Sequence, residues 1–168
     1  PLNPGDTTEI SVLNRIVRWN SQGIEYEADP RHAEIIVSEL GLKGAKLVTT
    51  PGVKSTSPEL AEPLGMREAT QFRSLVARAN YLAQDRMDIQ YSVKELTRRM
   101  SCPDSDDYMA LKRLGRYLVG KPRVVLYYNN QHSSRYLDCY VDTDWAGCTR
   151  TRRSTSGGGI RLGGHTVK

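Results

Sequence analysis

The sequence predicts an α+β fold in which a β-hairpin and a helix come first, three helices follow, and strands come last. Apolar residues recur at helical spacing over residues 68–121 and alternate with polar residues from position 122 onward. A stretch rich in Pro, Thr, Ser and Gly precedes the helices, and the chain contains no long internal repeat. We therefore expect four parts, with boundaries at 1–50, 51–67 (a linker), 68–121 and 122–168.

The first part is expected to be a hairpin followed by a helix. Residues 10–28 favour β-structure on both sides of a turn at residues 20–23. Asp29 then suits a helix N-cap, Pro30 suits the first helical position, and Gly41 suits the end of the helix. We interpret the apolar face of this helix as part of the core.

Residues 68–121 are predicted to form three amphipathic helices. The third carries acidic residues in its first turn and basic residues near its end. These charges are opposite in sign to the partial charges of the helix macrodipole at the two ends, which favours the helix. The three predicted apolar stripes are Phe72, Leu75, Val76, Ala79, Leu82 and Ala83; Ile89, Val93, Leu96 and Met100; and Tyr108, Leu111, Leu114 and Leu118.

Basic side chains gather at two places. Lys112, Arg113 and Arg116 lie away from the apolar stripe of the third helix, where they would form either a solvated surface or a track for phosphates. Three arginines in a loop could clasp phosphate or could simply be a solvated turn; they are Arg150, Arg152 and Arg153. The net charge of +5 and pI near 9.2 permit a nucleic-acid partner without requiring one.

Other classes of protein are disfavoured by composition. Three scattered cysteines without a paired spacing argue against a disulfide framework and favour a reducing, intracellular compartment. The three histidines lie far apart in sequence, so a zinc site is not expected. No apolar run is long enough to suggest a membrane span.

The last part contains three acidic residues with the same parity along a predicted strand and its exit: Asp138, Asp142 and Asp144. Side chains two and four residues apart on a strand share a face, and carboxylates on one face can gather Mg²⁺. Strand carboxylates more often simply face solvent. The neighbouring Trp145 is expected to be a packing anchor rather than a platform for a base.

Four blocks of the chain, in the same order and at similar spacing, resemble the Pol polyproteins of copia-type (Pseudoviridae) retrotransposons. Residues 71–83 and 85–89 resemble the family's YRSLVGxLxYLAxxRPDI segment. Residues 110–120 resemble AxKRVLRYLKGT, residues 142–147 resemble SDADWAG, and residues 153–157 resemble RKSTSG. Each block is weak alone, but together they are specific and span nearly all of the chain.

The resemblance implies a place within the polyprotein. Residues 1–50 would be the end of the reverse transcriptase palm, and residues 68–121 a segment like the thumb and connection. Residues 122–168 would be the first strands of an incomplete ribonuclease H-like sheet. Asp142 would then be the first metal-binding carboxylate of the nuclease, with Mg²⁺ as the parent enzyme's cofactor and an RNA–DNA hybrid or DNA as its partner.

The chain departs from this family pattern in ways that put its own catalysis in doubt. The paired carboxylates of the polymerase are not found, and Asp142 is the one nuclease carboxylate that we can match, so we regard the catalytic site as incomplete. Met87 stands where the family usually has Pro. The chain does not begin with Met, and we expect an excised segment.

Two functions follow as hypotheses. The chain could be a segment of a reverse transcriptase/ribonuclease H polyprotein, whose parent carries out RNA-directed DNA synthesis and RNA cleavage but which is inactive alone. Alternatively, it could be a non-catalytic basic scaffold or adaptor, derived from such an element. In that case, it would bind other protein subunits through an exposed sheet edge and apolar helix faces.

Overall fold

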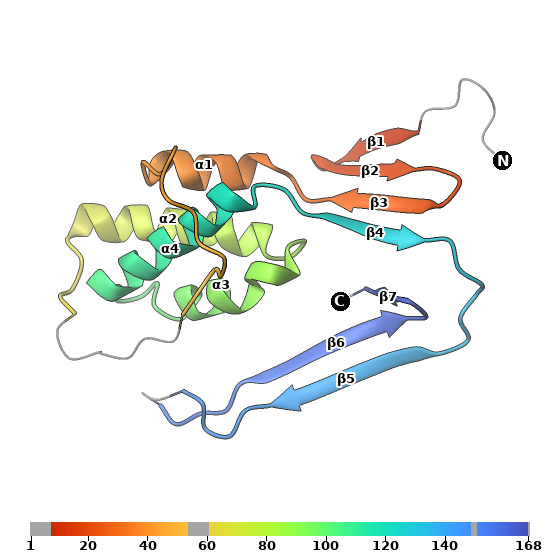
Figure 1. Ribbon diagram of the computed structural model, residues 1–168. Helices are drawn as coiled ribbons and strands as arrows, with labels where there is room; N and C mark the ends of the chain where they lie inside the picture. The colour runs from red at the N-terminus through yellow and green to blue at the C-terminus, as the bar shows by residue number, and fades with distance from the viewer. Residues whose placement is uncertain (1–7, 54–60, 149–150, 168) are drawn as a thin grey trace. The chain divides into compact units, whose positions relative to one another are not determined.

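The computed structural model describes residues 8–53, 61–148 and 151–167, and it is a mixed α+β structure with helices and two antiparallel sheets (Figure 1). The described residues divide into two compact units. Unit 1 holds residues up to 18 together with 25–126, and unit 2 holds residues 19–24 together with those from 127 onward. The α+β class predicted from the sequence is confirmed.

Three strands form where the sequence predicted a two-stranded hairpin over residues 10–28. They are β1 (Glu9–Val12), β2 (Arg15–Trp19) and β3 (Gly23–Glu27). The predicted first strand is broken because Leu13 and Asn14 both adopt positive φ, at 51° and 62°. Two consecutive residues with positive φ make the tight turn that antiparallel strands favour, and Asn tolerates this conformation. The lack of Gly at this turn explains why the pattern concealed it.

β4 (Val125–Asn129) lies where a strand was predicted, but it neighbours β3 in the four-stranded sheet β1-β2-β3-β4. Within unit 2, the backbone at Gly23 of β3 lies close to the backbone at Tyr128 of β4. A Cβ atom added to Gly23 would lie 2.1 Å from the carbonyl oxygen of Tyr128, so only Gly fits. The Asn130 N–H donates to the Gln22 carbonyl oxygen at 2.7 Å. The predicted division at residue 122 remains a prediction.

The helices follow the predicted order. They are α1 (Arg31–Glu39), α2 (Met66–Leu82), the short 3-10 helix η1 (Met87–Ile89), α3 (Gln90–Thr97) and α4 (Ser105–Gly120). Helix α4 begins with a capping box, in which the side chains of Asp104 and Asp107 accept from each other's backbone N–H groups. At α1, Asp29 accepts from the Arg31 N–H at 3.0 Å, and Gly41 has φ of +65° just after the helix.

The apolar stripes of these helices face one another. Buried side chains from α1, α2, η1, α3 and α4 form one core that includes Ile36, Phe72, Leu75, Ile89, Val93, Leu111, Leu114 and Leu118. Each such side chain contributes roughly 1.5–3 kcal/mol on burial. The expectation that apolar helix faces are open to protein partners is therefore wrong, because the faces are used within unit 1.

A buried arginine closes this core beside the end of α4. Arg86 is only 1% exposed, and it forms a fork with Asp88 through bonds of 2.9 and 2.7 Å. It also donates to the carbonyl oxygens of Lys121 and Pro122, and the Tyr117 hydroxyl donates to Asp88 at 2.9 Å. These bonds satisfy carbonyl groups around the α4 C-terminus that have no partner within the helix. Arg86 and Asp88, in the stretch that resembles the family's RPDI, thus have a structural role.

The second sheet contains β5 (Leu137–Thr143), β6 (Ser156–Leu162) and β7 (His165–Thr166) in that order (Figure 1). Directly opposed residues share a face of the sheet, so the register shows which side chains lie on each face. Leu137, Cys139 and Val141 lie opposite Leu162, Ile160 and Gly158, whereas Asp138, Tyr140 and Asp142 lie opposite Arg161, Gly159 and Gly157. The first face is apolar except for Thr143 opposite Ser156, and the second carries the charged side chains.

Every residue of β5 is exposed, and Val141 is 87% exposed. Binding of partners through an exposed sheet edge remains a prediction. Among the described residues, no helix has both the length and the hydropathy needed to cross a bilayer.

Candidate nucleic-acid and metal sites

Asp142 lies near the end of β5, exposed, on the polar face of the sheet. Its Oδ1 atom accepts from the neighbouring Thr143 N–H at 2.8 Å. Asp144 does not join it, because Asp144 Oδ1 accepts from the backbone N–H groups of Thr155 at 2.6 Å and Gly147 at 3.3 Å. Asp144 therefore holds the loop between β5 and β6.

The acidic residues of β5 do not make a metal site by themselves. In the part of the chain that the structure describes, no group of three or more His, Cys, Asp or Glu residues could hold an ion. Asp138 faces Arg161 across the strand pair. Asp142 is thus one exposed oxygen ligand, whereas a protein Mg²⁺ site with two ions needs several carboxylates around it.

Trp145 is 95% exposed, so its predicted role as a packing anchor is wrong. It lies two residues after the end of β5, in a loop where Ala146 has positive φ and the Ala146 N–H donates to Ser154 Oγ at 3.1 Å. Backbone N–H groups that donate to Asp144 Oδ1 and Ser154 Oγ, rather than packing of the indole, hold this loop.

The basic residues of α4 hold a neighbouring segment in place. Arg116 donates to the Lys46 carbonyl oxygen at 2.6 Å, and Arg113 donates to Thr50 Oγ1 at 2.7 Å. Both arginines are half-buried. The residues after α1 therefore lie along this side of α4, which the sequence reading had treated as open surface.

Close packing along the same side of α4 depends on small residues. A Cβ atom on Gly115 would lie 2.5 Å from Leu42 Cδ1, and one on Gly120 would lie 3.2 Å from Leu47 Cβ.

Lys112 differs from its arginine neighbours, since its Nζ lies 5.0 Å from the centroid of the Tyr108 ring.

The predicted loop arginines are only partly described. Arg150 lies outside the described residues. Arg152 and Arg153 are exposed, Arg152 has φ of 53°, and the Arg153 carbonyl oxygen accepts from the Cys148 N–H at 3.2 Å. Their binding to nucleic acid remains a prediction.

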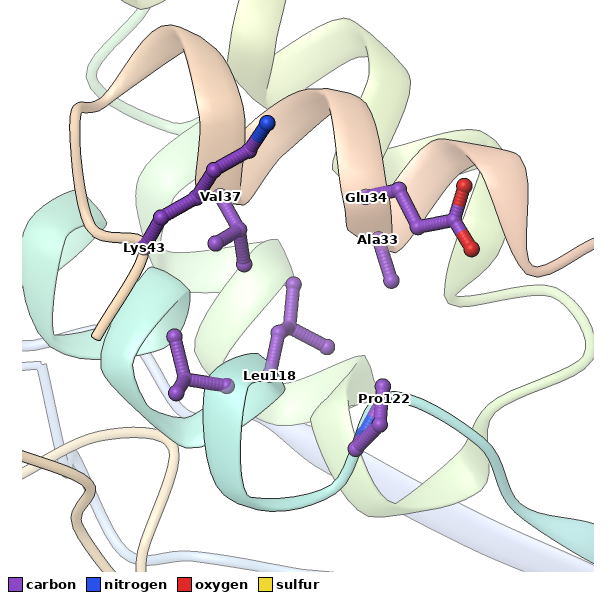
Figure 2. A pocket seen from close by; sticks show the side chains of 7 residues that line it. Ala33, Glu34, Val37, Lys43, Leu118 and Pro122 are labelled. Atoms are coloured by element: carbon purple, nitrogen blue, oxygen red, sulfur yellow. The ribbon is translucent and has the colours of Figure 1, made fainter. Parts of the chain in front are cut away.

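A shallow apolar pocket of about 200 Å³ lies between α1 and the end of α4 (Figure 2). Its aliphatic lining comes from Ala33, Val37, Leu118, Val119 and Pro122, with Glu34 and Lys43 completing the lining. A pocket with this lining can hold an apolar side chain, but it offers no convergent polar groups for catalysis.

Sequence reasoning missed the buried ionic groups of unit 1. Glu27 is buried at the end of β3, where Arg123 forms a fork with it and Arg18 donates to it at 3.1 Å. These arginines lower the pKa of Glu27 against the opposing effect of burial. The partners are up to 96 residues apart in sequence, so no local pattern could have revealed them.

Comparison with known proteins places the chain among transposon polyproteins. The retrovirus-related Pol polyprotein from transposon RE2 of Arabidopsis thaliana is 34% identical over 139 residues, which is 82% of this chain and 9% of the polyprotein. The corresponding protein from transposon RE1 is 36% identical over 123 residues, which is 73% of this chain and 8% of its own length. An uncharacterized mitochondrial protein of the same plant is 35% identical over 130 residues, covering 76% of this chain and 52% of that protein.

No protein-family model matches the chain, and no solved structure matches it significantly. The identity over most of the chain nevertheless defines the class: these residues correspond to part of a transposon Pol polyprotein. The chain belongs to the copia-type retrovirus-related Pol polyproteins. It spans less than a tenth of the length of the RE1 and RE2 relatives.

Proposed function

We propose that these residues connect the end of the reverse transcriptase palm to the start of the ribonuclease H domain in a copia-type Pol polyprotein. The parent would carry out RNA-directed DNA synthesis and cleave RNA in RNA–DNA hybrids, using Mg²⁺. The chain itself would be non-catalytic and would contribute a folded support with contacts to nucleic acid. The observation that carries the proposal is the family membership, combined with a packed helical middle followed by an acidic strand.

The geometry around Asp142 supports the non-catalytic part of the proposal. An exposed carboxylate, with Asp144 committed to the loop, cannot surround two ions. Two-metal cleavage needs both ions in place, because they stabilise the attacking and the leaving oxygen together. Groups that act as a unit lose most of their rate enhancement when partners are missing.

A labelled RNA–DNA hybrid tests both parts of this proposal. The pure chain should bind the hybrid with an affinity that falls steeply with salt, because phosphate contacts release counterions. It should release no labelled product with Mg²⁺ or Mn²⁺. Turnover that survives further purification and disappears in Asp142→Asn would overturn the non-catalytic assignment, and absence of hybrid binding at low salt would overturn the nucleic-acid role.

A second function, a scaffold or adaptor that binds other proteins, is favoured by the uncovered apolar face of β5 and β6. Leu137, Cys139 and Val141 are exposed side by side on that face. Monomeric proteins rarely leave such a face open, because apolar area in water costs free energy. If the chain binds proteins rather than nucleic acid, hybrid binding should be absent and association should persist at high salt.

A further inference from the structure

Three arginines surround His32 in unit 1, and they come from three different elements. Arg15 lies on β2, Arg31 and His32 begin α1, and Arg78 lies on α2. We call these four residues the basic cluster. One nitrogen of Arg78, Nη1, lies 3.5 Å from His32 Nδ1, and the His32 ring lies 4.8 Å from the Tyr81 ring. The guanidinium carbon of Arg15 lies 5.4 Å from the centroid of the same Tyr81 ring.

Two of the three arginines have a carboxylate of their own. Arg31 forms a fork with Asp29 through distances of 2.6 to 3.1 Å. Arg15 donates from Nε to Asp85 at 2.7 Å. Asp85 also accepts from the Tyr26 hydroxyl at 2.7 Å, so both of its oxygens are occupied.

Arg78 is left without an acidic partner. Among the described residues, no carboxylate lies within ion-pair distance of it, and its Nε atom is buried without a hydrogen-bond partner. Its guanidinium contacts the His32 ring, which must present an unprotonated Nδ1 to accept from it. Three guanidinium groups thus face two carboxylates, and a positive charge remains uncompensated in a half-buried position.

The charge state of His32 is consistent with this imbalance. Burial lowers the pKa of His32, and the neighbouring Arg78, Arg31 and Arg15 lower it further against the opposing effect of Asp29. His32 is therefore neutral near pH 7 and adds no charge, and its Nε2 atom lies 3.8 Å from Asp29 Oδ2. The cluster remains reachable from solvent, since the Arg31 side chain is 60% exposed.

We propose that the basic cluster is a binding site for a phosphate oxyanion, with Arg78 as the principal ligand and Arg31 and His32 at its edge. Guanidinium forks match the geometry of phosphate oxygens, and a phosphate would supply the acceptor that Arg78 lacks. The phosphate belongs either to a nucleic-acid backbone or to a small molecule. The nucleic-acid source rests on the proposed function, whereas the oxyanion site does not.

This assignment differs from the basic residues that the sequence suggested. Arg113 and Arg116 of α4 already bind Thr50 and the Lys46 carbonyl oxygen. Arg113 Nε is also buried without a partner, but Arg113 Nη2 donates to a hydroxyl group, whereas Arg78 has the neutral His32 ring at 3.5 Å. Burying an unpaired donor costs stability. Such a cost is expected at positions retained for binding.

Binding of a short fluorescein-labelled single-stranded DNA, measured by anisotropy across a range of salt, tests the proposal. Arg78→Gln is compared with Arg67→Gln, an exposed arginine at the start of the same helix that gives an equal change in charge. We expect Arg78→Gln to weaken binding by about tenfold and to reduce the salt slope by about one, with Arg67→Gln close to wild type. Arg78→Lys should keep the slope, because the charge remains.

Thermal unfolding of the same variants separates binding from a structural role. Arg78→Gln should melt close to wild type, because the internal contact that it loses, with the His32 ring, is a long one of 3.5 Å. Equal binding by the Arg78 and Arg67 variants would overturn the nucleic-acid source of the phosphate. A clear loss of melting temperature in Arg78→Gln, without a specific loss of binding, would overturn the site altogether.

Inorganic phosphate distinguishes the two sources of the ligand. If phosphate raises the melting temperature of wild type but not of Arg78→Gln, at matched ionic strength in chloride, the oxyanion site stands. If phosphate stabilises wild type in this way while Arg78→Gln and Arg67→Gln bind DNA equally, the ligand of the site is a small phosphate. The wild-type chain could bind the RNA–DNA hybrid while Arg78→Gln changes neither DNA binding nor the effect of phosphate. That result would leave the proposed function standing and would refute this inference.

Discussion

The helical core of unit 1 and the β5–β7 sheet of unit 2 differ in how far their apolar side chains are buried. In unit 1 the apolar stripes of four α-helices and η1 cover one another, and Phe72, Leu75 and Leu114 are fully buried. In the β5–β7 sheet the register sorts apolar from polar residues just as clearly, yet the whole of β5 is exposed. Correct patterning is therefore not enough for stability, because a face also needs a covering layer.

The largest expected effect comes from opening a cavity in the covered region. Phe72→Ala should lower the free energy of unfolding by about 3–5 kcal/mol, because the buried ring leaves a space that its neighbours only partly fill. Val141→Ala, on the exposed apolar face of β5, should change it by less than about 0.5 kcal/mol. Urea unfolding followed by circular dichroism measures both. Equal losses would mean that Val141 is covered in solution, and the contrast between the regions would fail.

Next in size is the loss of the buried fork between Arg86 and Asp88. Arg86→Ala should cost about 3 kcal/mol, because the carbonyl groups of Lys121 and Pro122 lose a donor and Asp88 keeps the Tyr117 hydroxyl but loses its counter-ion. Arg67→Ala removes an exposed arginine of the same unit and should be close to neutral. A small effect at Arg86 would show that water replaces it and that the core is more open at this end than its burial indicates.

Two glycines sharpen the comparison between the sheets. Gly23→Ala should destabilise the four-stranded sheet by about 1–3 kcal/mol, since the new Cβ would meet the Tyr128 carbonyl oxygen. Gly157→Ala, opposite Asp142 in the second sheet, meets nothing within 4 Å and should be neutral or slightly stabilising. Hydrogen exchange of the β3 and β4 amides would report the first change, and unchanged protection in Gly23→Ala would contradict the close approach.

The sequence predicted most elements because their signals are local. Helical spacing located α2 and α4, acidic residues in the first turn marked the start of α4, and alternation after position 122 predicted strands in the part of the chain that holds β5 and β6. It missed the turn at Leu13, because a leucine with positive φ carries no turn signal.

Sequence reasoning could not predict the pairing of distant charges. The basic cluster joins β2, α1 and α2, and Glu27 meets Arg123 across most of the chain. Such contacts depend on how elements pack, which no spacing rule encodes. Sequence did identify Asp142 through the family resemblance, but its exposure and the commitment of Asp144 to the loop required the structure.

The smallest effect that we predict is a pH dependence that belongs to unit 1 alone. Arg123 and then Arg18 hold the pKa of Glu27 below its ordinary value of 4.5, even though burial opposes them. A carboxyl whose pKa is lower in the folded state stabilises the fold above the unfolded value and loses that contribution as pH falls through the folded value. The Arg123 side chain is 56% exposed, so solvent screening limits the contribution to about 1 kcal/mol.

The difference in unfolding free energy between wild type and Glu27→Gln should therefore be greatest near neutral pH and should shrink below about pH 4.5. Glu34→Gln, an exposed carboxylate on α1, is the matched control and should show no such trend. A difference that stays constant down to acid pH would mean that Glu27 contributes through packing and neutral hydrogen bonds. Buried ionic pairing would then no longer distinguish unit 1 from the exposed sheet, and the apolar core alone would account for the contrast.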